Sequence, residues 1–116
     1  MRREDDYQVR REHLAGLTDE QLYDKFWSLI GEIVDPLLEL GKEYTSPSVE
    51  RSVLLRMGFS SLEAKAIVDG CVERSLLGHG AGNVVYKLSK AKGLGVREAG
   101  VELAAGKYWD EVVAMF

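Results

Sequence analysis

The cysteine and histidine side chains that could ligate a metal ion or serve in nucleophilic catalysis are few and widely spaced in this sequence. Its 116 residues contain one cysteine, Cys71, and two histidines, His13 and His79. A zinc site draws on cysteine, histidine and carboxylate ligands at short, regular spacings, which these residues lack. A cysteine nucleophile needs a histidine base, and only folding could bring one to Cys71. The sequence therefore predicts Cys71 as a small core side chain, and no catalysis by this chain alone.

A glycine-rich stretch, residues 78–82, has the composition of a loop that cradles a phosphate, because glycine lets backbone N–H groups approach an anion. The stretch follows a predicted helix instead of a strand, however. It also lacks the lysine-serine pair of a nucleotide-binding loop. The favoured interpretation is a connection between helices with a glycine cap.

Residues 88–97 have the helix, turn and helix pattern of a DNA-binding motif. In such a motif the phosphate contacts would come from Lys87, Lys90, Lys92 and Arg97. The formal net charge of −4 opposes a general attraction to nucleic acid, and the turn is richer in glycine than the motif needs. A solvated basic face is the favoured interpretation. A helix-turn-helix regulator over residues 87–103 is the alternative.

The strongest local signals lie in residues 46–77, which predict two helices joined by a tight turn. Ser46 and Pro47 suit the start of the first helix, and Gly58 suits a left-handed residue after its end. Ser60 and Glu63 form a capping box for the second helix. The predicted apolar stripe of the first helix is Val49, Val53, Leu54 and Met57. The second helix is predicted to bury Ala64, Ile67, Val68, Cys71 and Val72.

A longer helix is predicted to begin at Asp19, because Thr18 and Gln21 form a second capping box. It should continue to about Leu40 with one wide apolar face. Pro36 lacks a backbone N–H group, so a bend or a break is expected next to it. The residues of this predicted face are Leu22, Phe26, Leu29, Ile30, Ile33, Val34, Leu37 and Leu38.

Two further helices are predicted to end at Gly93 and Gly106. No stretch alternates apolar and polar residues over the length of a strand. We therefore expect an all-α fold, a single small domain of about five to six helices joined by short Gly, Ser and Pro turns. Residues 1–17 are predicted to be a charged N-terminal arm, and residues 18–116 the helical domain. For the arm, a solvated end is favoured over a frayed helix or a segment that orders against a partner.

The composition also indicates the cellular compartment and the kinds of partner that we expect for the protein. No apolar run follows the N-terminus, and no stretch approaches membrane-spanning length. A single cysteine permits no internal disulfide, which fits a reducing compartment. A cytoplasmic protein with neither a membrane nor a nucleic-acid partner is therefore expected.

The C-terminal tail is predicted to be a helix with one apolar and aromatic face. Such a terminus either closes the core of its own chain or docks on another protein, and the pattern leaves both open. Together with a tyrosine of the charged arm, the tail supplies the candidate partner-contacting residues. These are Tyr7, Tyr108, Trp109, Val112, Val113 and Phe116.

Four stretches of the chain resemble one known family. Residues 46–61 (SPSVERSVLLRMGFSS), 80–86 (GAGNVVY), 96–100 (VREAG) and 106–112 (GKYWDEV) are similar, in the same order, to the small (alpha) subunits of D-ornithine 4,5-aminomutase. The likeness covers nearly the whole chain. Long contiguous matches of this kind are much more specific than a short motif.

The resemblance implies a non-catalytic component of an isomerase that transfers an amino group within its substrate. Its large subunit would carry adenosylcobalamin and pyridoxal phosphate (PLP) and interconvert D-ornithine and 2,4-diaminopentanoate. The resemblance further implies an assembly of two small and two large chains. A generic helical adaptor is the other alternative that the pattern allows.

The residues themselves favour no cofactor site in this chain. Cobalamin is ligated by the histidine of an Asp-x-His-x-x-Gly motif, in which the aspartate accepts the histidine N–H. His13 and Gly16 match this motif, but Arg11 stands where the aspartate belongs. None of the seven lysines has the sequence context of a PLP site. We therefore assign no catalytic, cofactor-binding or metal-binding residue to this chain.

Overall fold

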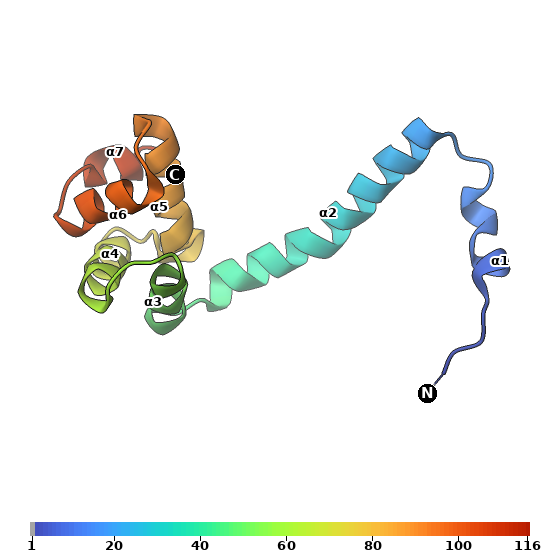
Figure 1. Cartoon of the computed structure of the whole chain (residues 1–116), viewed down its shortest axis with the longest axis horizontal. Helices are drawn as coiled ribbons and strands as arrows, with labels where there is room; N and C mark the ends of the chain where they lie inside the picture. The colour runs from blue at the N-terminus through green and yellow to red at the C-terminus, as the bar shows by residue number, and fades with distance from the viewer. Residues whose placement is uncertain (1) are drawn as a thin grey trace. The chain divides into compact units, whose positions relative to one another are not determined.

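The computed structural model describes residues 2–116, and in that range it contains helices and no strand (Figure 1). The predicted all-α fold with short connections is confirmed. In chain order the elements are α1 (Tyr7–Arg10), the 3-10 helix η1 (Glu12–Leu14), α2 (Asp19–Tyr44), α3 (Pro47–Arg56), α4 (Ser61–Glu73), the 3-10 helix η2 (Leu77–His79), α5 (Ala81–Lys92), α6 (Val96–Ala104) and α7 (Trp109–Val113). No helix among the described residues is both long and apolar enough to cross a membrane.

The chain divides into two compact units, an N-terminal unit of residues 1–38 and a C-terminal unit of residues 39–116. The division falls within α2, which belongs to both. The predicted boundary between an arm and a domain after residue 17 stays a prediction.

The first helix of the N-terminal unit, α1, is a single turn flanked by ion pairs. The Asp6 carboxylate pairs with Arg10 and Arg3, at 2.6 Å in each case. The hydrogen bond from Arg10, helped by Arg3, holds the pKa of Asp6 below its ordinary value. Of the alternatives for the arm, the structure therefore contains a short helix, α1.

The predicted capping box at the start of α2 is confirmed. The Gln21 N–H donates to Thr18 Oγ1 at 3.2 Å, and the Thr18 N–H donates to Gln21 Oε1 at 3.0 Å. Each bond satisfies a backbone donor that has no partner within the helix. The expected start at Asp19 is therefore correct.

Of the two outcomes expected at Pro36, the break is wrong, because α2 is one helix of 26 residues with Pro36 inside it, whereas the bend stays a prediction. Proline removes one backbone donor, so the carbonyl of Glu32 loses its helical partner. Glu32 is exposed, and an exposed carbonyl is satisfied by water at little free-energy loss. The turns on both sides therefore continue the helix, which ends at Tyr44 and not near Leu40.

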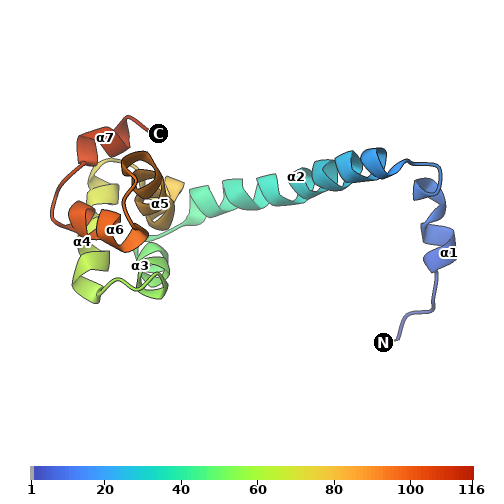
Figure 2. The same cartoon turned by 45° about the horizontal axis from the view of Figure 1, so that its top comes forward.

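The core of the C-terminal unit is formed by α3 to α7. Helix α4 packs against α3 and α6, and α5 packs against the same two helices, as both views show (Figures 1 and 2). The buried apolar residues belong to this unit. They are Leu54, Phe59, Ala64, Ile67, Val68, Cys71, Leu76, Ala81, Val84, Val85, Leu88, Ala99, Leu103, Trp109 and Val112.

The predicted turn between α3 and α4 is confirmed in detail. The Val49 N–H donates to Ser46 Oγ at 3.3 Å, and Gly58 has a φ of +94°. At the start of α4 the Ser60 N–H donates to Glu63 Oε2 at 2.7 Å, and the Glu63 N–H donates to Ser60 Oγ at 3.3 Å. These contacts lie within four residues of one another, which explains why the sequence reveals them.

The predicted apolar stripe of α3 is only partly correct. Leu54 is buried, but Val49 and Val53 are exposed, and the other buried residue of this helix is Glu50. One Glu50 oxygen accepts the Thr45 hydroxyl at 2.5 Å, and the other accepts the Ala81 N–H at 2.8 Å. A carboxylate can be buried when hydrogen-bond donors such as these satisfy its oxygens. The Glu50 side chain therefore faces the core, where it binds the N-terminal end of α5.

The burial predicted for α4 is correct for four residues and wrong for Val72, which is 49% exposed. Gly70 is buried instead, because the indole of Trp109 lies against it. A Cβ atom added at Gly70 would come within 2.2 Å of Trp109 Cζ2. The tryptophan therefore covers the edge of α4 opposite to Val72.

Candidate partner interface

One wide apolar face runs along α2, and we name it the apolar face of α2. Helix geometry places its members on one half of the helix circumference. They are Leu22, Tyr23, Phe26, Trp27, Leu29, Ile30, Ile33, Val34, Leu37, Leu38, Leu40 and Tyr44. The other half carries charged and polar side chains, namely Asp24, Lys25, Ser28, Glu32, Asp35, Glu39, Lys42 and Glu43.

This face has no core of its own. Considered by itself, the N-terminal unit buries none of the described residues 2–38. Ten of the twelve members are exposed, from 38% for Val34 to 73% for Tyr44, whereas Leu22 and Ile30 are half-buried. Sequence analysis predicted the face but not its exposure, because a periodic pattern does not say what covers it.

The first half of the face contains an aromatic cluster. The Trp27 ring meets the rings of Tyr23 and Phe26 edge to face, at centroid distances of 6.2 and 5.3 Å. All three rings are more than half exposed. Large aromatic side chains with an apolar body are the residues that most often dominate protein–protein binding.

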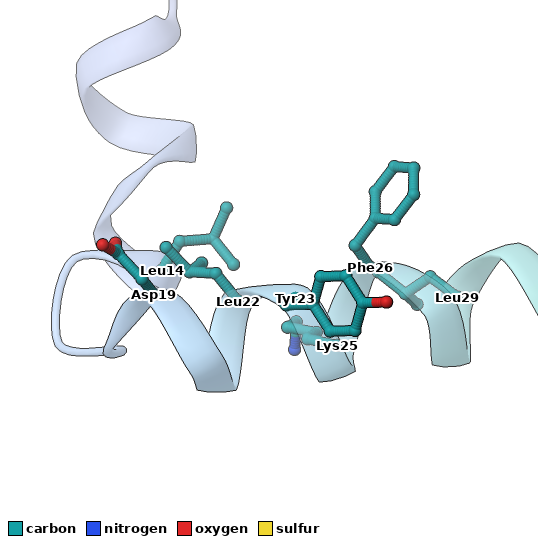
Figure 3. Close-up of a pocket in the computed structure, with 7 residues that line it drawn as sticks. All are labelled: Leu14, Asp19, Leu22, Tyr23, Lys25, Phe26 and Leu29. Carbon is teal, nitrogen blue, oxygen red and sulfur yellow. The ribbon is translucent and has the colours of Figure 1, made fainter.

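A hollow of about 490 Å³ lies beside this cluster, within the N-terminal unit (Figure 3). Leu14 of η1 and Leu22, Phe26 and Leu29 of α2 form its apolar lining. Its other lining residues are Asp19, Tyr23 and Lys25. The hollow is therefore suited to apolar side chains from a partner.

The predicted interface at the C-terminal tail needs correction for two residues. Trp109 is 6% exposed and Val112 is fully buried, both in the core of this chain. The indole N–H of Trp109 donates to the Leu103 carbonyl at 3.1 Å, and the guanidinium of Arg74 lies 4.6 Å from a Trp109 ring centre. For these two, the structure therefore shows the alternative that the pattern left open, closure of the chain's own core.

The remaining predicted contact residues differ in exposure. Tyr7 and Val113 are exposed, at 60% and 45%. Tyr108 and Phe116 are half-buried against the core, and the Phe116 ring lies 4.8 Å from the His79 ring. Contact of these four with a partner stays a prediction.

The cations of the alternative DNA-binding motif have partners within the chain. Arg97 forms a bidentate salt bridge with Glu63, with N–O distances of 2.7 and 3.0 Å, and Lys92 forms a salt bridge with Glu111. The pair with Arg97, together with the Ser60 N–H, lowers the pKa of Glu63 from its ordinary 4.5 to about 2. The two other cations lie over aromatic rings, Lys87 over Phe116 and Lys90 over Tyr86. These contacts give no support to a phosphate-binding face.

Cys71, His13 and His79 differ in burial and belong to different elements. Cys71 is fully buried, and burial, with the nearby Glu50 charge, raises the pKa of its thiol to about 12. His13 is on the exposed η1, whereas His79 lies on η2 of the other unit. Among the described residues no group of three or more His, Cys, Asp or Glu side chains is arranged to hold a metal ion. A thiol with so high a pKa stays protonated at neutral pH, which does not suit a nucleophile.

The apolar face of α2 is the candidate site that the predicted contact residues missed. Its signal was present in the sequence as a face about half a helix wide, whereas one neighbouring helix needs a narrower stripe. Tyr23, Trp27, Leu40 and Tyr44 extend this face beyond its predicted members. The missing information was that no part of residues 2–38 supplies a covering element.

Comparisons with known proteins agree over the length of the chain. A family model described as D-ornithine 4,5-aminomutase alpha-subunit matches residues 2–116. A curated relative from Acetoanaerobium sticklandii, the protein named D-ornithine 4,5-aminomutase subunit alpha, is 61% identical over 116 residues. That alignment covers 100% of this chain and 96% of the relative.

Proposed function

Because the chain belongs to the family of D-ornithine 4,5-aminomutase alpha subunits, we propose that it is a non-catalytic subunit that binds a large catalytic subunit through the apolar face of α2. One observation carries this proposal: an amphipathic helix of 26 residues whose apolar half is not buried. A subunit of an enzyme requires a partner chain, and this face offers it ten exposed large apolar side chains.

The exposed area is of the size that a stable interface needs. Ten large apolar side chains of this face are 38–73% exposed. Together they expose roughly 1,000 Å², whereas apolar patches on monomeric proteins rarely exceed a few hundred Å². One partner contributes about 800 Å² to a typical stable interface. The apolar face of α2 therefore supplies enough surface for a lasting complex.

We place both cofactors, adenosylcobalamin and PLP, in the large subunit. The reaction of the assembly is the interconversion of D-ornithine and 2,4-diaminopentanoate. Such cofactors supply radical chemistry and amino-group activation, and the protein around them must exclude side reactions. The contribution of this chain is to bind and brace the large subunit, so that its active site stays closed to solvent.

Two small and two large chains form the proposed assembly, and its proposed location is the cytoplasm. The single cysteine, free and buried, is compatible with a reducing compartment. The acidic net charge and the paired cations of the C-terminal unit support a protein partner over a nucleic acid.

Co-expression with the large subunit tests the proposal. Replacing Phe26 and Ile33 by glutamate places two charges on the apolar face of α2 and is expected to abolish co-purification. The control replaces Ser28 by glutamate, which adds a charge on the polar half, and it should assemble normally. If the Phe26→Glu, Ile33→Glu chain still co-purifies in equal amount, the interface is elsewhere. Circular dichroism of both variants controls for helix content.

Absorption spectra of the same preparations test the placement of the cofactors. The complex should show the bands of cobalamin and PLP after reconstitution, whereas this chain alone should leave both spectra unchanged. A defined Schiff-base band formed by the isolated chain would contradict the proposal that PLP binds to the large subunit alone.

A further inference from the structure

Ten of the twelve residues of the apolar face of α2 lie in two parallel rows. Each row repeats with steps of four and three, the spacing of a seam that packs against one neighbouring helix. The first seam is Leu22, Phe26, Leu29, Ile33 and Leu40, with Pro36 at the position between the last two. The second seam is Tyr23, Trp27, Ile30, Val34 and Leu37.

The two seams point in different directions. They are offset by one residue, and consecutive residues of an α-helix are about 100° apart around its axis. A single helix or flat surface packed on the first seam therefore leaves most of the second uncovered. Covering both requires two contacting elements, one on each side.

Both seams are exposed to a similar degree. In the first, Phe26 and Ile33 are 54% and 62% exposed, and in the second, Trp27 and Val34 are 54% and 38% exposed. The edge-to-face contact of Phe26 with Trp27 joins the seams into one surface. Neither seam has a covering element among residues 2–38.

The polar half of α2 indicates which side stays in water. It carries five carboxylates against two lysines, and these are Asp24, Glu32, Asp35, Glu39 and Glu43 with Lys25 and Lys42. Burying such a cluster of like charges without partners is unfavourable. The helix can therefore be enclosed on its two seams and remains open along the acidic side.

We infer that α2 is bound in a groove of the large subunit, with one apolar segment of that subunit against the first seam and a second, separate segment against the other. This inference rests on the proposed function and adds the geometry of the partner's site. The hollow lined by Leu14 and Phe26 extends the first seam toward η1 and receives apolar side chains of the first segment.

Two other occupants fit the surface less well. A second copy of this chain, pairing α2 with α2, covers one seam on each helix and leaves the other exposed. The C-terminal unit has already closed its core, with Leu54, Ile67 and Leu88 fully buried within it. A large subunit with two apolar segments satisfies both seams at once.

Photo-crosslinking in the assembled complex tests this arrangement. The crosslinker p-benzoylphenylalanine replaces Phe26 or Ile33 of the first seam, or Trp27 or Val34 of the second, in separate preparations of the complex. Ser28, on the polar half, is the control position and should give no crosslink. The crosslinked peptides are identified by mass spectrometry. The expected result is that the two seams crosslink to two different segments of the large subunit.

Each other outcome has a defined meaning. Crosslinks from both seams to the same segment, or from one seam alone, overturn the two-sided groove while leaving the docking of α2 intact. Crosslinks to a second copy, or to the C-terminal unit of the same chain, identify a different occupant and overturn the inference. No crosslink to the large subunit from any of the four positions in an intact complex contradicts the proposed function itself.

Affinity measurements give an independent readout. The double variant Phe26→Ala, Ile33→Ala and the double variant Trp27→Ala, Val34→Ala should each weaken binding of the large subunit by at least about thirtyfold. Ser28→Ala with Glu32→Ala is the matched control and should bind as the natural chain does. Unchanged affinity of the second-seam variant would overturn the two-sided groove.

Discussion

Trp27 and Trp109, the two tryptophans of the chain, lie in opposite surroundings. Trp109 is 6% exposed, its N–H is bonded to a carbonyl, and its ring lies against Gly70. Trp27 is 54% exposed, and its ring contacts are with Tyr23 and Phe26 of the same helix. The first closes a core within the C-terminal unit, whereas the second belongs to a surface that the described residues of the N-terminal unit do not bury.

The difference reflects helix length as much as composition. Helices α3 to α7 have between 5 and 13 residues, and tight turns fold each of them back on its neighbours. Helix α2 has 26 residues, about 39 Å at the ordinary helical rise, and contains no turn that could bring a neighbouring helix to its apolar face. A long amphipathic helix in so short a chain therefore fits the proposed contact with a partner.

The largest expected effect separates the two tryptophans. Trp109→Ala should lower the free energy of unfolding by about 3–5 kcal/mol, because it leaves a cavity beside Gly70. Trp27→Ala should leave unfolding of the isolated chain nearly unchanged, within about 0.5 kcal/mol, since the side chain is half exposed. Chemical denaturation followed by circular dichroism measures both.

Binding of the large subunit reverses this order. Trp27→Ala should weaken binding by about 2 kcal/mol, or roughly thirtyfold, whereas the folded fraction of Trp109→Ala should bind nearly normally. If Trp109→Ala melts normally but fails to assemble, the tail is an interface after all and the comparison of the two regions is wrong.

Two helical glycines give the next largest contrast. Gly70→Ala should destabilise the isolated chain by about 1–3 kcal/mol, because the new Cβ atom would lie 2.2 Å from Trp109 Cζ2. At Gly31 of α2 the nearest atom to an added Cβ is Asp35 Oδ2, at an ordinary 3.8 Å. Gly31→Ala should therefore favour the helix by about 0.5–1 kcal/mol. Equal melting curves for the two variants would show that Trp109 does not pack on Gly70.

Loss of one capping box is expected to destabilise the whole C-terminal unit, whereas loss of the other should affect only the first turn of α2. Ser60→Ala should lower the free energy of cooperative unfolding by about 1 kcal/mol, because α4 is part of the core. Thr18→Ala removes the same kind of bond, but α2 has no buried residue to couple its first turn to a core. We expect fraying there, seen by amide hydrogen exchange near residue 19, with an unchanged denaturation midpoint. A shifted midpoint for Thr18→Ala would show that the two units unfold together.

The smallest effect concerns two carboxylates with lowered pKa values, Glu63 and Asp6. A lowered pKa in the folded state adds stability that is present above the ordinary pKa and is lost as the pH falls through the folded value. For Glu63 this window lies between 4.5 and about 2. The melting temperature of the natural protein should therefore fall as the pH drops through this range, and that of the Glu63→Gln variant should fall less steeply. The corresponding Asp6→Asn change should not have this effect, because Asp6 pairs only with Arg3 and Arg10 of its own unit.

The caps and turns of this chain could be predicted because their partners are close in sequence. Ser60 with Glu63, and Thr18 with Gln21, are three residues apart, and Gly58 needs only its own freedom at positive φ. The inward face of α3 could not be predicted in this way. Glu50 is buried because Ala81, 31 residues later, donates to its carboxylate.

The capped starts of α2, α3 and α4 and the glycine turns follow from residue types within a few positions, and the family follows from contiguous matches. The tertiary structure decided which apolar faces are covered. It placed Trp109 against Gly70 and left Trp27 exposed, although both belong to amphipathic patterns. Periodicity fixes only the direction in which side chains point, whereas burial depends on elements far apart in the chain and, in the proposal for α2, on another protein.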